Sequence, residues 1–391
     1  MSKLKLIFVT GTRADYGKLK SLMRICDMDS EIETYIYVTG MHLMPEYGLT
    51  YNDILSDGYK NIRTHQGNNF TVRMDENLAY TVLSFSGFVR EVKPYLIVVH
   101  GDRIEPLASA IVGVLNNIRV AHIEGGEITG TADEFMRHAI SKLSSLHFVA
   151  NNESKYRLVQ LGEHEKNIHV IGSPDIDIML SSNLPSLVDI KVKYKIVFEN
   201  YAILIYHPVT TSANLQSEIN QVVSAVIDSG KNYIVINPNN DHGSDIILKE
   251  LERLHENEHF MFFKSIVFED FLVLLKNSEF IIGNSSAGVR EACVYGVPAI
   301  DIGTRQNKRY IPEALKNIQH TFEVREDILD KIKQTDKHRY ISGYFGDGRS
   351  AELFLQCIKK TAVSESNLQK SFVELDVTSE AIMNYINEVC F

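Results

Sequence analysis

Short apolar, β-branched runs alternate with helix-like stretches along most of this chain, and this alternation constrains the fold more than any other feature. In the first half, strand-like runs occupy residues 5–10, 34–39, 95–100, 118–123, 146–150 and 168–172. Helix-like stretches lie between them, at residues 17–26, 77–92, 105–115, 134–144 and 153–161. Strands that alternate with helices predict βαβ units, and hence a mostly parallel sheet covered by helices on both faces.

The second half of the chain repeats the pattern. Strand-like runs occupy residues 201–207, 233–237, 259–263, 279–283 and 297–302, and helix-like stretches occupy 215–228, 245–256, 268–277 and 287–295. Residues 181–200 lack a clear periodicity, and we interpret them as a linker with a short helix. The chain is therefore predicted to be an α/β protein with two Rossmann-like doubly wound domains facing a cleft, where ligands bind beyond the carboxyl ends of the strands.

The length of 391 residues agrees with two domains. We expect residues 1–180 to form an N-terminal domain that carries catalytic carboxylates. Residues 181–365 are expected to form a C-terminal nucleotide-binding domain. Residues 366–391 are expected to form a C-terminal helix able to pack back on the first domain.

Charge and cysteine usage exclude several classes of function. The formal net charge of −10 argues against sequence-independent binding of nucleic acid. The four cysteines show no CxxC pairing, which favours reduced thiols over a disulfide frame or a zinc site. The start of the chain lacks the pattern of a signal peptide, and no apolar run approaches the ~20 residues of a membrane span. We therefore expect a cytoplasmic protein that binds neither nucleic acid nor membrane.

The loop after the first strand, VTGTRADYGKLK, combines a flexible glycine with fixed positive charge. Gly11 permits a tight turn, the following helix offers backbone N–H groups, and Arg13 and Lys18 add positive charge. These features indicate a loop that faces the phosphates of a substrate. An ordinary strand-to-helix turn with Asp15 as the helix N-cap is the alternative.

A second loop of this kind, FIIGNSSAGVREA, follows a strand of the second half. Ser285 and Ser286 occupy positions where helix N-caps lie, and together with backbone N–H groups they can bind a diphosphate. Glu291, further along the predicted helix, could accept hydrogen bonds from ribose hydroxyls. The alternative is a serine-capped helix with a solvated glutamate.

Acidic residues at strand ends are the candidates for acid–base chemistry. Asp102 and Arg103 end one strand, whereas Glu124 and Asp133 lie in the glycine-rich segment HIEGGEITGTADEF. His207 ends the run YAILIYH, where Pro208 favours an extended backbone. A histidine cluster at residues 255–259 does not have the spacing of a helical HExxH site, so we expect no metal there.

Several of these motifs together resemble one enzyme family. TGTRADYGKL, HGDR, HIEGGEITGTADEFMRHAISKL, YHPVTT, NPNNDHGS, GNSSAGVRE and GTRQNKR are similar to segments of the hydrolysing UDP-N-acetylglucosamine 2-epimerases of bacterial sialic acid synthesis. The resemblance covers roughly residues 3–360. It implies the two-domain glycosyltransferase-B architecture and a reaction in which UDP-N-acetylglucosamine and water give N-acetylmannosamine and UDP. The implied route eliminates UDP to form 2-acetamidoglucal, which is then hydrated.

The resemblance also implies roles for individual residues. Asp102, Glu124 and Asp133 would be catalytic, and His207 would act where the sugar meets the diphosphate. UDP would be bound by Arg13, Arg103, Asn239, Ser285, Ser286, Glu291 and Arg305. No cofactor and no metal is expected; the expected partners are UDP-N-acetylglucosamine, UDP and further copies of the chain in a homodimer or homotetramer.

Other functions remain open from the sequence. A near relative with the same motifs hydrolyses a UDP-linked 2,4-diacetamido-2,4,6-trideoxyhexose for legionaminic acid synthesis. A glycosyltransferase of this architecture would need an acceptor site, which the sequence does not show. A non-catalytic sugar-nucleotide-binding protein would keep the UDP-binding residues and lose the carboxylates, all of which are present here.

Overall fold

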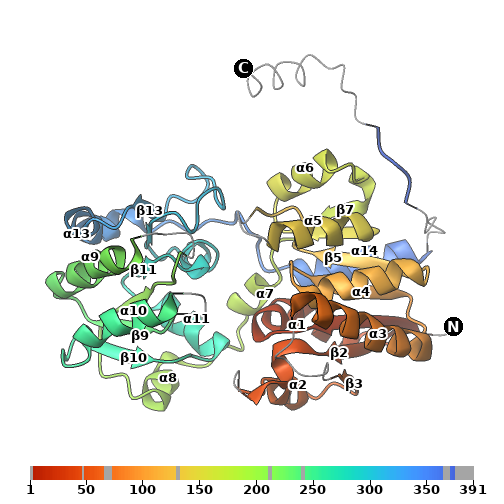
Figure 1. Cartoon of the computed structure of the whole chain (residues 1–391), viewed down its shortest axis with the longest axis horizontal. Coiled ribbons are helices and arrows are strands. Elements are labelled where there is room, and N and C mark those ends of the chain that lie inside the picture. The colour runs from red at the N-terminus through yellow and green to blue at the C-terminus, as the bar shows by residue number, and fades with distance from the viewer. Residues whose placement is uncertain are drawn as a thin grey trace. The chain divides into compact units, whose positions relative to one another are not determined.

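The computed structural model describes residues 3–45, 48–65, 73–128, 133–209, 214–238, 243–363 and 370–374. The chain forms two compact units, each built around one parallel β-sheet (Figure 1). Unit 1 comprises Met1–Gly172 together with Ala351–Phe391, and unit 2 comprises Ser173–Ser350. The predicted fold class, two doubly wound α/β domains, is therefore confirmed. Within the described ranges, no helix is long and apolar enough to cross a membrane.

The sheet of unit 1 has the strand order β3-β2-β1-β4-β5-β6-β7. Its strands are β1 (Leu4–Thr10), β2 (Ile32–Val38), β3 (Asn61–Thr64), β4 (Leu96–His100), β5 (Arg119–Ile123), β6 (Leu146–Val149) and β7 (Ile168–Val170). Its main helices are α1 (Arg13–Met28), α2 (Tyr51–Ser56), α3 (Met74–Val92), α4 (Ile104–Leu115), α5 (Asp133–Leu143), α6 (Asn152–Gln160) and α14 (Ser350–Val363). The strand order reverses direction between β1 and β4, and ligands of such sheets bind at this switch point, beyond the carboxyl ends of the strands.

The sheet of unit 2 is built in the same way, with the order β10-β9-β8-β11-β12-β13. Its strands are β8 (Ala202–Ile205), β9 (Tyr233–Ile236), β10 (Phe260–Phe263), β11 (Ile281–Gly283), β12 (Ala299–Ile302) and β13 (Ile318–Thr321). Its helices include α7 (Asp175–Met179), α8 (Leu187–Lys193), α9 (Leu215–Asp228), α10 (Ser244–Leu251), α11 (Phe268–Lys276), α12 (Ala292–Tyr295) and α13 (Arg325–Gln334). The switch point of this sheet lies between β8 and β11.

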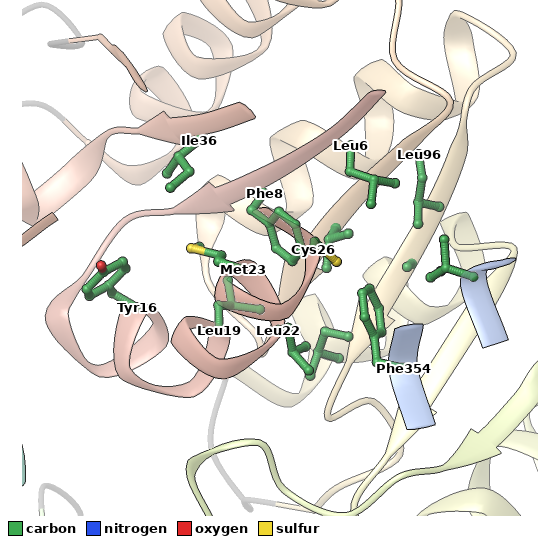
Figure 2. Packing of buried hydrophobic residues seen from close by; sticks show 14 of the residues in the cluster. Leu6, Phe8, Tyr16, Leu19, Leu22, Met23, Cys26, Ile36, Leu96 and Phe354 are labelled. Carbon is green, nitrogen blue, oxygen red and sulfur yellow. The ribbon is translucent and has the colours of Figure 1, made fainter. Parts of the chain in front are cut away.

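The central strands are apolar on both faces because helices cover both faces of each sheet. In β1, Leu6 and Phe8 join one hydrophobic core, whereas Ile7 and Val9 join the core on the opposite face. Figure 2 shows the first of these cores, where Phe354 of α14 packs close to Phe8. The ring centroids of these two residues are 6.2 Å apart. Helix α14 is thus an integral part of unit 1.

The structure corrects the expected domain limits. Unit 1 ends at Gly172 rather than at residue 180, and the chain returns to it at Ala351, before the expected limit at residue 365. The cause of the second difference is the burial of Phe354 and Ile358, both 0 % exposed, in the core of unit 1. Most of the helix expected in residues 366–391 lies outside the described residues.

Candidate active site

The loop between β1 and α1 is organised by the carboxylate of Asp15. The backbone N–H groups of Gly11 and Thr12 donate to this carboxylate over 3.0 and 3.2 Å. Thr12 is the N-cap of α1, and its side chain accepts from the backbone N of Asp15, which completes a capping box. Thr12, and not Asp15, is therefore the N-cap of α1, and Asp15 occupies the backbone N–H groups of Gly11 and Thr12. Arg13 and Lys18 are the basic side chains of this loop.

Glu124 follows β5 directly and is the most constrained of the candidate carboxylates. Its side chain lies between two basic groups, with Lys18 Nζ 3.3 Å from Oε1 and His100 Nε2 3.0 Å from Oε2. Glu124 is 5 % exposed, and its φ of 60° is in the left-handed region that residues with a β-carbon rarely adopt. Such strained, buried groups are concentrated at functional sites. The structure thus places Lys18, predicted to bind substrate, on a candidate catalytic carboxylate.

Asp102 lies in the turn after β4, on the other side of the switch point from Gly11. Its carboxylate forms an ion pair with the guanidinium of Arg137 on α5, which is 4 % exposed. Arg137 also donates through Nη1 to the backbone oxygen of Glu127, over 3.0 Å. Asp133 is exposed and begins the same helix, so α5 carries both Asp133 and, about one turn later, the partner of Asp102.

Arg103 is exposed, next to Asp102, at the start of α4. Its Nη2 lies 3.5 Å from the sulfur of Met41, and its Nε is 4.0 Å from a carboxylate oxygen of Glu105. Burial raises the pKa of Glu105, although the charge of Arg103 opposes this shift. Arg103 therefore keeps a guanidinium at the solvent edge of the switch point, where it can meet an anionic substrate.

In unit 2, the side-chain amide of Asn284 fixes the backbone of His207. Asn284 Oδ1 accepts from the backbone N of His207 over 2.7 Å, and Nδ2 donates to the backbone oxygen of His207 over 2.8 Å. Burial, with a smaller effect of Arg305, lowers the pKa of His207 to about 3. The imidazole of His207 is therefore neutral near pH 7 and able to hydrogen-bond without adding charge.

The loop after β11 differs from the predicted helix start. Gly283 has a φ of 129°, and a β-carbon there would lie 1.9 Å from the backbone oxygen of Ile205, so only glycine fits. Ser285 caps a 3₁₀ turn, η5 (Ser286–Gly288), instead of an α-helix. The predicted helix over 287–295 is reduced to α12, which is consistent with the low helix propensity of Gly288.

Two further candidates of unit 2, Glu291 and Arg305, lie close to this loop in the sequence or the structure. Glu291 is 9 % exposed, so the alternative of a solvated glutamate is wrong. Arg305 Nη1 lies 3.3 Å from the backbone oxygen of Asn284. Gln306 Nε2 donates to the same oxygen over 2.8 Å. Asn239, also predicted to bind UDP, lies outside the described residues.

The sequence reasoning missed several polar residues that hold the candidates in place. His100, Arg137 and Asn284 each contact a candidate residue directly. The sequence position of Asn284 could have indicated a site residue, because a polar residue that follows a buried strand in a doubly wound fold lies at the ligand-binding edge. In the part of the chain that the structure describes, no group of three or more His, Cys, Asp or Glu side chains could hold a metal ion.

Two doubly wound units, each built around one parallel sheet, are the architecture of the glycosyltransferase-B fold. A solved structure, a UDP-GlcNAc 2-epimerase of Neisseria meningitidis bound to UDP-GlcNAc, has the same fold. It aligns with a TM-score of 0.77 and 18% identity, over 91% of this chain and 100% of the other.

Sequence comparison gives closer relationships. The chain is 43% identical over 381 residues to a UDP-N-acetylglucosamine 2-epimerase of Neisseria meningitidis serogroup B, covering 95% of this chain and 100% of the relative. It is 32% identical to a UDP-N,N'-diacetylbacillosamine 2-epimerase (hydrolyzing) of Legionella pneumophila, over 94% of this chain and 98% of the relative. Residues 24–359 match the family model for UDP-N-acetylglucosamine 2-epimerase. The chain therefore belongs to the UDP-N-acetylglucosamine 2-epimerase family.

Proposed function

We propose that this protein is a hydrolysing 2-epimerase that converts UDP-N-acetylglucosamine and water to N-acetylmannosamine and UDP, as a supply for sialic acid synthesis. The observation that carries the proposal is the buried Glu124 carboxylate held between Lys18 and His100. The 43% identical relative has UDP-N-acetylglucosamine in its name and supports the choice of substrate. The hydrolysing outcome is supported by the name of the Legionella relative.

The proposed reaction begins with departure of UDP. The bond between C1 of the sugar and the phosphate oxygen breaks, and its electron pair leaves with UDP. Carboxylates stabilise the positive charge that develops at C1, and one of them removes the C2 proton to give the C1=C2 double bond of 2-acetamidoglucal. Water then adds its hydroxyl to C1 and gives its other proton to a carboxylate, while a second carboxylate delivers a proton to C2 on the face opposite to the one from which the first proton was removed. The carboxylates proposed for these steps are Asp102, Glu124 and Asp133.

The environments of these groups support the proposed roles. The guanidinium of Arg137 is ion-paired with Asp102, so a positive charge lies against that carboxylate. His100 and Lys18 both lie within hydrogen-bond distance of the Glu124 carboxylate. The proposed UDP-binding set is Arg13, Arg103, Asn239, Ser285, Ser286, Glu291 and Arg305, with the neutral His207 at the junction of sugar and diphosphate.

The reaction can be tested directly with purified protein and UDP-N-acetylglucosamine in heavy water. We expect free UDP and N-acetylmannosamine that carries one solvent deuterium at C2, detected by mass spectrometry. Intact UDP-N-acetylmannosamine as the end product would show a non-hydrolysing epimerase instead. Binding of UDP without any turnover would indicate a sugar-nucleotide-binding protein.

A second candidate function is hydrolysis of a UDP-linked diacetamido-trideoxyhexose. The 32% identical Legionella relative, named for a UDP-N,N'-diacetylbacillosamine substrate, favours it. The two substrates differ at C4 and C6, so parallel assays with both would separate the functions. Turnover of the diacetamido sugar nucleotide alone would establish the second candidate.

A cytoplasmic location and a homodimer or homotetramer stay predictions, and light scattering would give the oligomeric state.

A further inference from the structure

A buried histidine of β5 connects the segments that carry the candidate carboxylates. His122 is 0 % exposed and lies two residues before Glu124. Its Nε2 is 2.8 Å from the backbone oxygen of Gly101, the residue before Asp102. Its Nδ1 is 3.0 Å from Oγ of Ser141, on the helix that also carries Asp133 and Arg137. One imidazole thus joins the turn after β4, the end of β5 and helix α5.

The hydrogen-bond partners fix the tautomer of this imidazole. The backbone oxygen of Gly101 can only accept, so Nε2 carries the proton, and Nδ1 accepts from the hydroxyl of Ser141. Burial lowers the pKa of His122 to about 3, although the hydrogen bond to Gly101 opposes this shift. The ring is therefore neutral near pH 7 and can hold both hydrogen bonds at once.

The packing around His122 restricts the backbone of two turns, the turn after β4 at Gly101 and the turn after β5 at Glu124 and Gly125. A β-carbon on Gly125 would lie 2.9 Å from His122 Nδ1 and 3.0 Å from Ser141 Oγ, so the chain after Glu124 packs directly on this pair. Gly101 and Glu124 both have a positive φ, at 75° and 60°. Glycine adopts a positive φ readily, whereas Glu124, which has a β-carbon, keeps it only where the surroundings hold it. His122 belongs to the strand that leads into the turn of Glu124, and it contacts the turn of Gly101.

We propose that His122, oriented by Ser141, is a positioning residue that sets the placement of Asp102, Glu124 and α5 relative to one another. The proposal rests on the proposed function, since these carboxylates must meet C1 and C2 of one sugar. His122 does not act on substrate in this scheme; it acts through the backbone of Gly101 and through α5. Displacement of a catalytic group by as little as 1 Å costs about 100-fold in rate.

Two substitutions separate the hydrogen bonds of His122. The amide nitrogen of Gln reaches the place of Nε2, so His122→Gln keeps a donor for Gly101. The amide oxygen of Asn lies near the place of Nδ1, so His122→Asn keeps only the acceptor for Ser141. We expect kcat to fall about 100-fold in His122→Asn and far less in His122→Gln, with the Kd of UDP unchanged in both.

Ser141→Ala removes the group that orients the ring, and it should lower kcat to a value between those of the two His122 variants. His147→Gln is the matched control. His147 lies opposite His122 on the neighbouring strand, is 1 % exposed, and its Nε2 hydrogen-bonds Glu163 over 3.0 Å. Gln keeps a donor for Glu163, so the ion pairs of Glu163 with Lys142 of α5 and with Lys370 are preserved in this variant. His147→Gln should keep kcat close to that of the wild type even if its melting temperature falls.

The outcomes distinguish this role from a general loss of structure. The proposal would be overturned if the kcat of His122→Asn equals that of the wild type. It would also be overturned if His147→Gln loses as much kcat as His122→Asn when the two variants have the same melting temperature. Absence of turnover in the wild type would refute the proposed function instead. The positioning role can then still be read from hydrogen exchange at Gly101–Arg103 without substrate, which should be faster in His122→Asn than in His122→Gln. Equal exchange rates in the two variants would contradict it.

Discussion

At the residue scale, two candidate carboxylates of unit 1, Asp102 and Glu124, have different basic partners. Asp102 pairs with a guanidinium, which keeps its proton donors at every accessible pH. Glu124 contacts the imidazole of His100 and the ammonium of Lys18. The two carboxylates therefore face different donors: a planar guanidinium for Asp102, and a ring nitrogen and an ammonium for Glu124.

Substitution of Asp102 should separate catalysis from binding. Asp102→Asn is nearly isosteric and removes the charge, so we predict that turnover falls by about 10²–10⁴-fold while UDP still binds. Glu291→Ala should instead weaken UDP binding by roughly 1–3 kcal/mol, because it removes a charge-assisted hydrogen bond. Calorimetric titration with UDP checks both. If Asp102→Asn abolishes UDP binding, or Glu291→Ala leaves it intact, the assignments are wrong.

We predict that Asp301, near the end of β12, makes the free energy of unfolding depend on pH. It is 5 % exposed, and burial raises its pKa to about 6, opposed by a hydrogen bond from Tyr310 and the nearby His320. A raised pKa means that the stability present below the unfolded-state value near 4 is lost as pH rises through 6. Asp301→Asn should therefore raise the free energy of unfolding at pH 7 by roughly 3 kcal/mol, and by little near pH 4.

Urea unfolding at several pH values tests the prediction for Asp301. The exposed Asp327 on α13 gives a control, since Asp327→Asn removes the same charge from solvent. If Asp301→Asn raises the free energy of unfolding by the same amount at every pH, the raised pKa of Asp301 is not the cause.

At the element scale, periodicity alone was enough to predict most strands and helices. Apolar runs correctly predicted the described strands of both sheets other than β3 and β13. The edge strands β3 and β13 were missed because their sequences, NIRT and IQHT, carry polar residues on a half-exposed edge. The contacts of His100, Arg137 and Asn284 could not be predicted, since each joins elements whose distance depends on the tertiary fold. The same is true of α14, whose assignment to unit 1 depends on which core buries Phe354.

The C-terminal segment contributes to the placement of α5. Lys370 Nζ donates to the backbone oxygens of Lys142 and Ser144 over 2.9 and 2.8 Å, and it forms an ion pair with Glu163. A cation at a helix C-terminus satisfies the last carbonyls and interacts favourably with the helix dipole. We predict that Lys370→Met accelerates hydrogen exchange in α5 and lowers the melting temperature.

Lys359→Met is the matched control for Lys370→Met. Lys359 also lies near the C-terminus, but it pairs with Asp29 and Glu31 instead of α5. If hydrogen exchange in α5 is equally fast in both variants, or is unchanged in Lys370→Met, the C-terminal segment does not stabilise α5.

At the scale of the whole molecule, an acidic protein is proposed to bind an acidic ligand. The net charge of −10 repels a nucleoside diphosphate at long range, so affinity must come from local cations, hydroxyls and backbone donors. Arg13 and Arg103 in unit 1 and Arg305 in unit 2 are the proposed cations, and the guanidinium group matches phosphate geometry in a bidentate manner.

Because these side chains can neutralise the diphosphate, we predict that a divalent metal ion is not required. Initial rates of UDP release should be the same before and after exhaustive treatment with EDTA and gel filtration. Arg305→Lys keeps the charge but loses the bidentate geometry, so it should raise KM by about tenfold while magnesium fails to restore it. Loss of activity on chelation and its recovery with magnesium would show that the leaving diphosphate depends on a metal rather than on arginine.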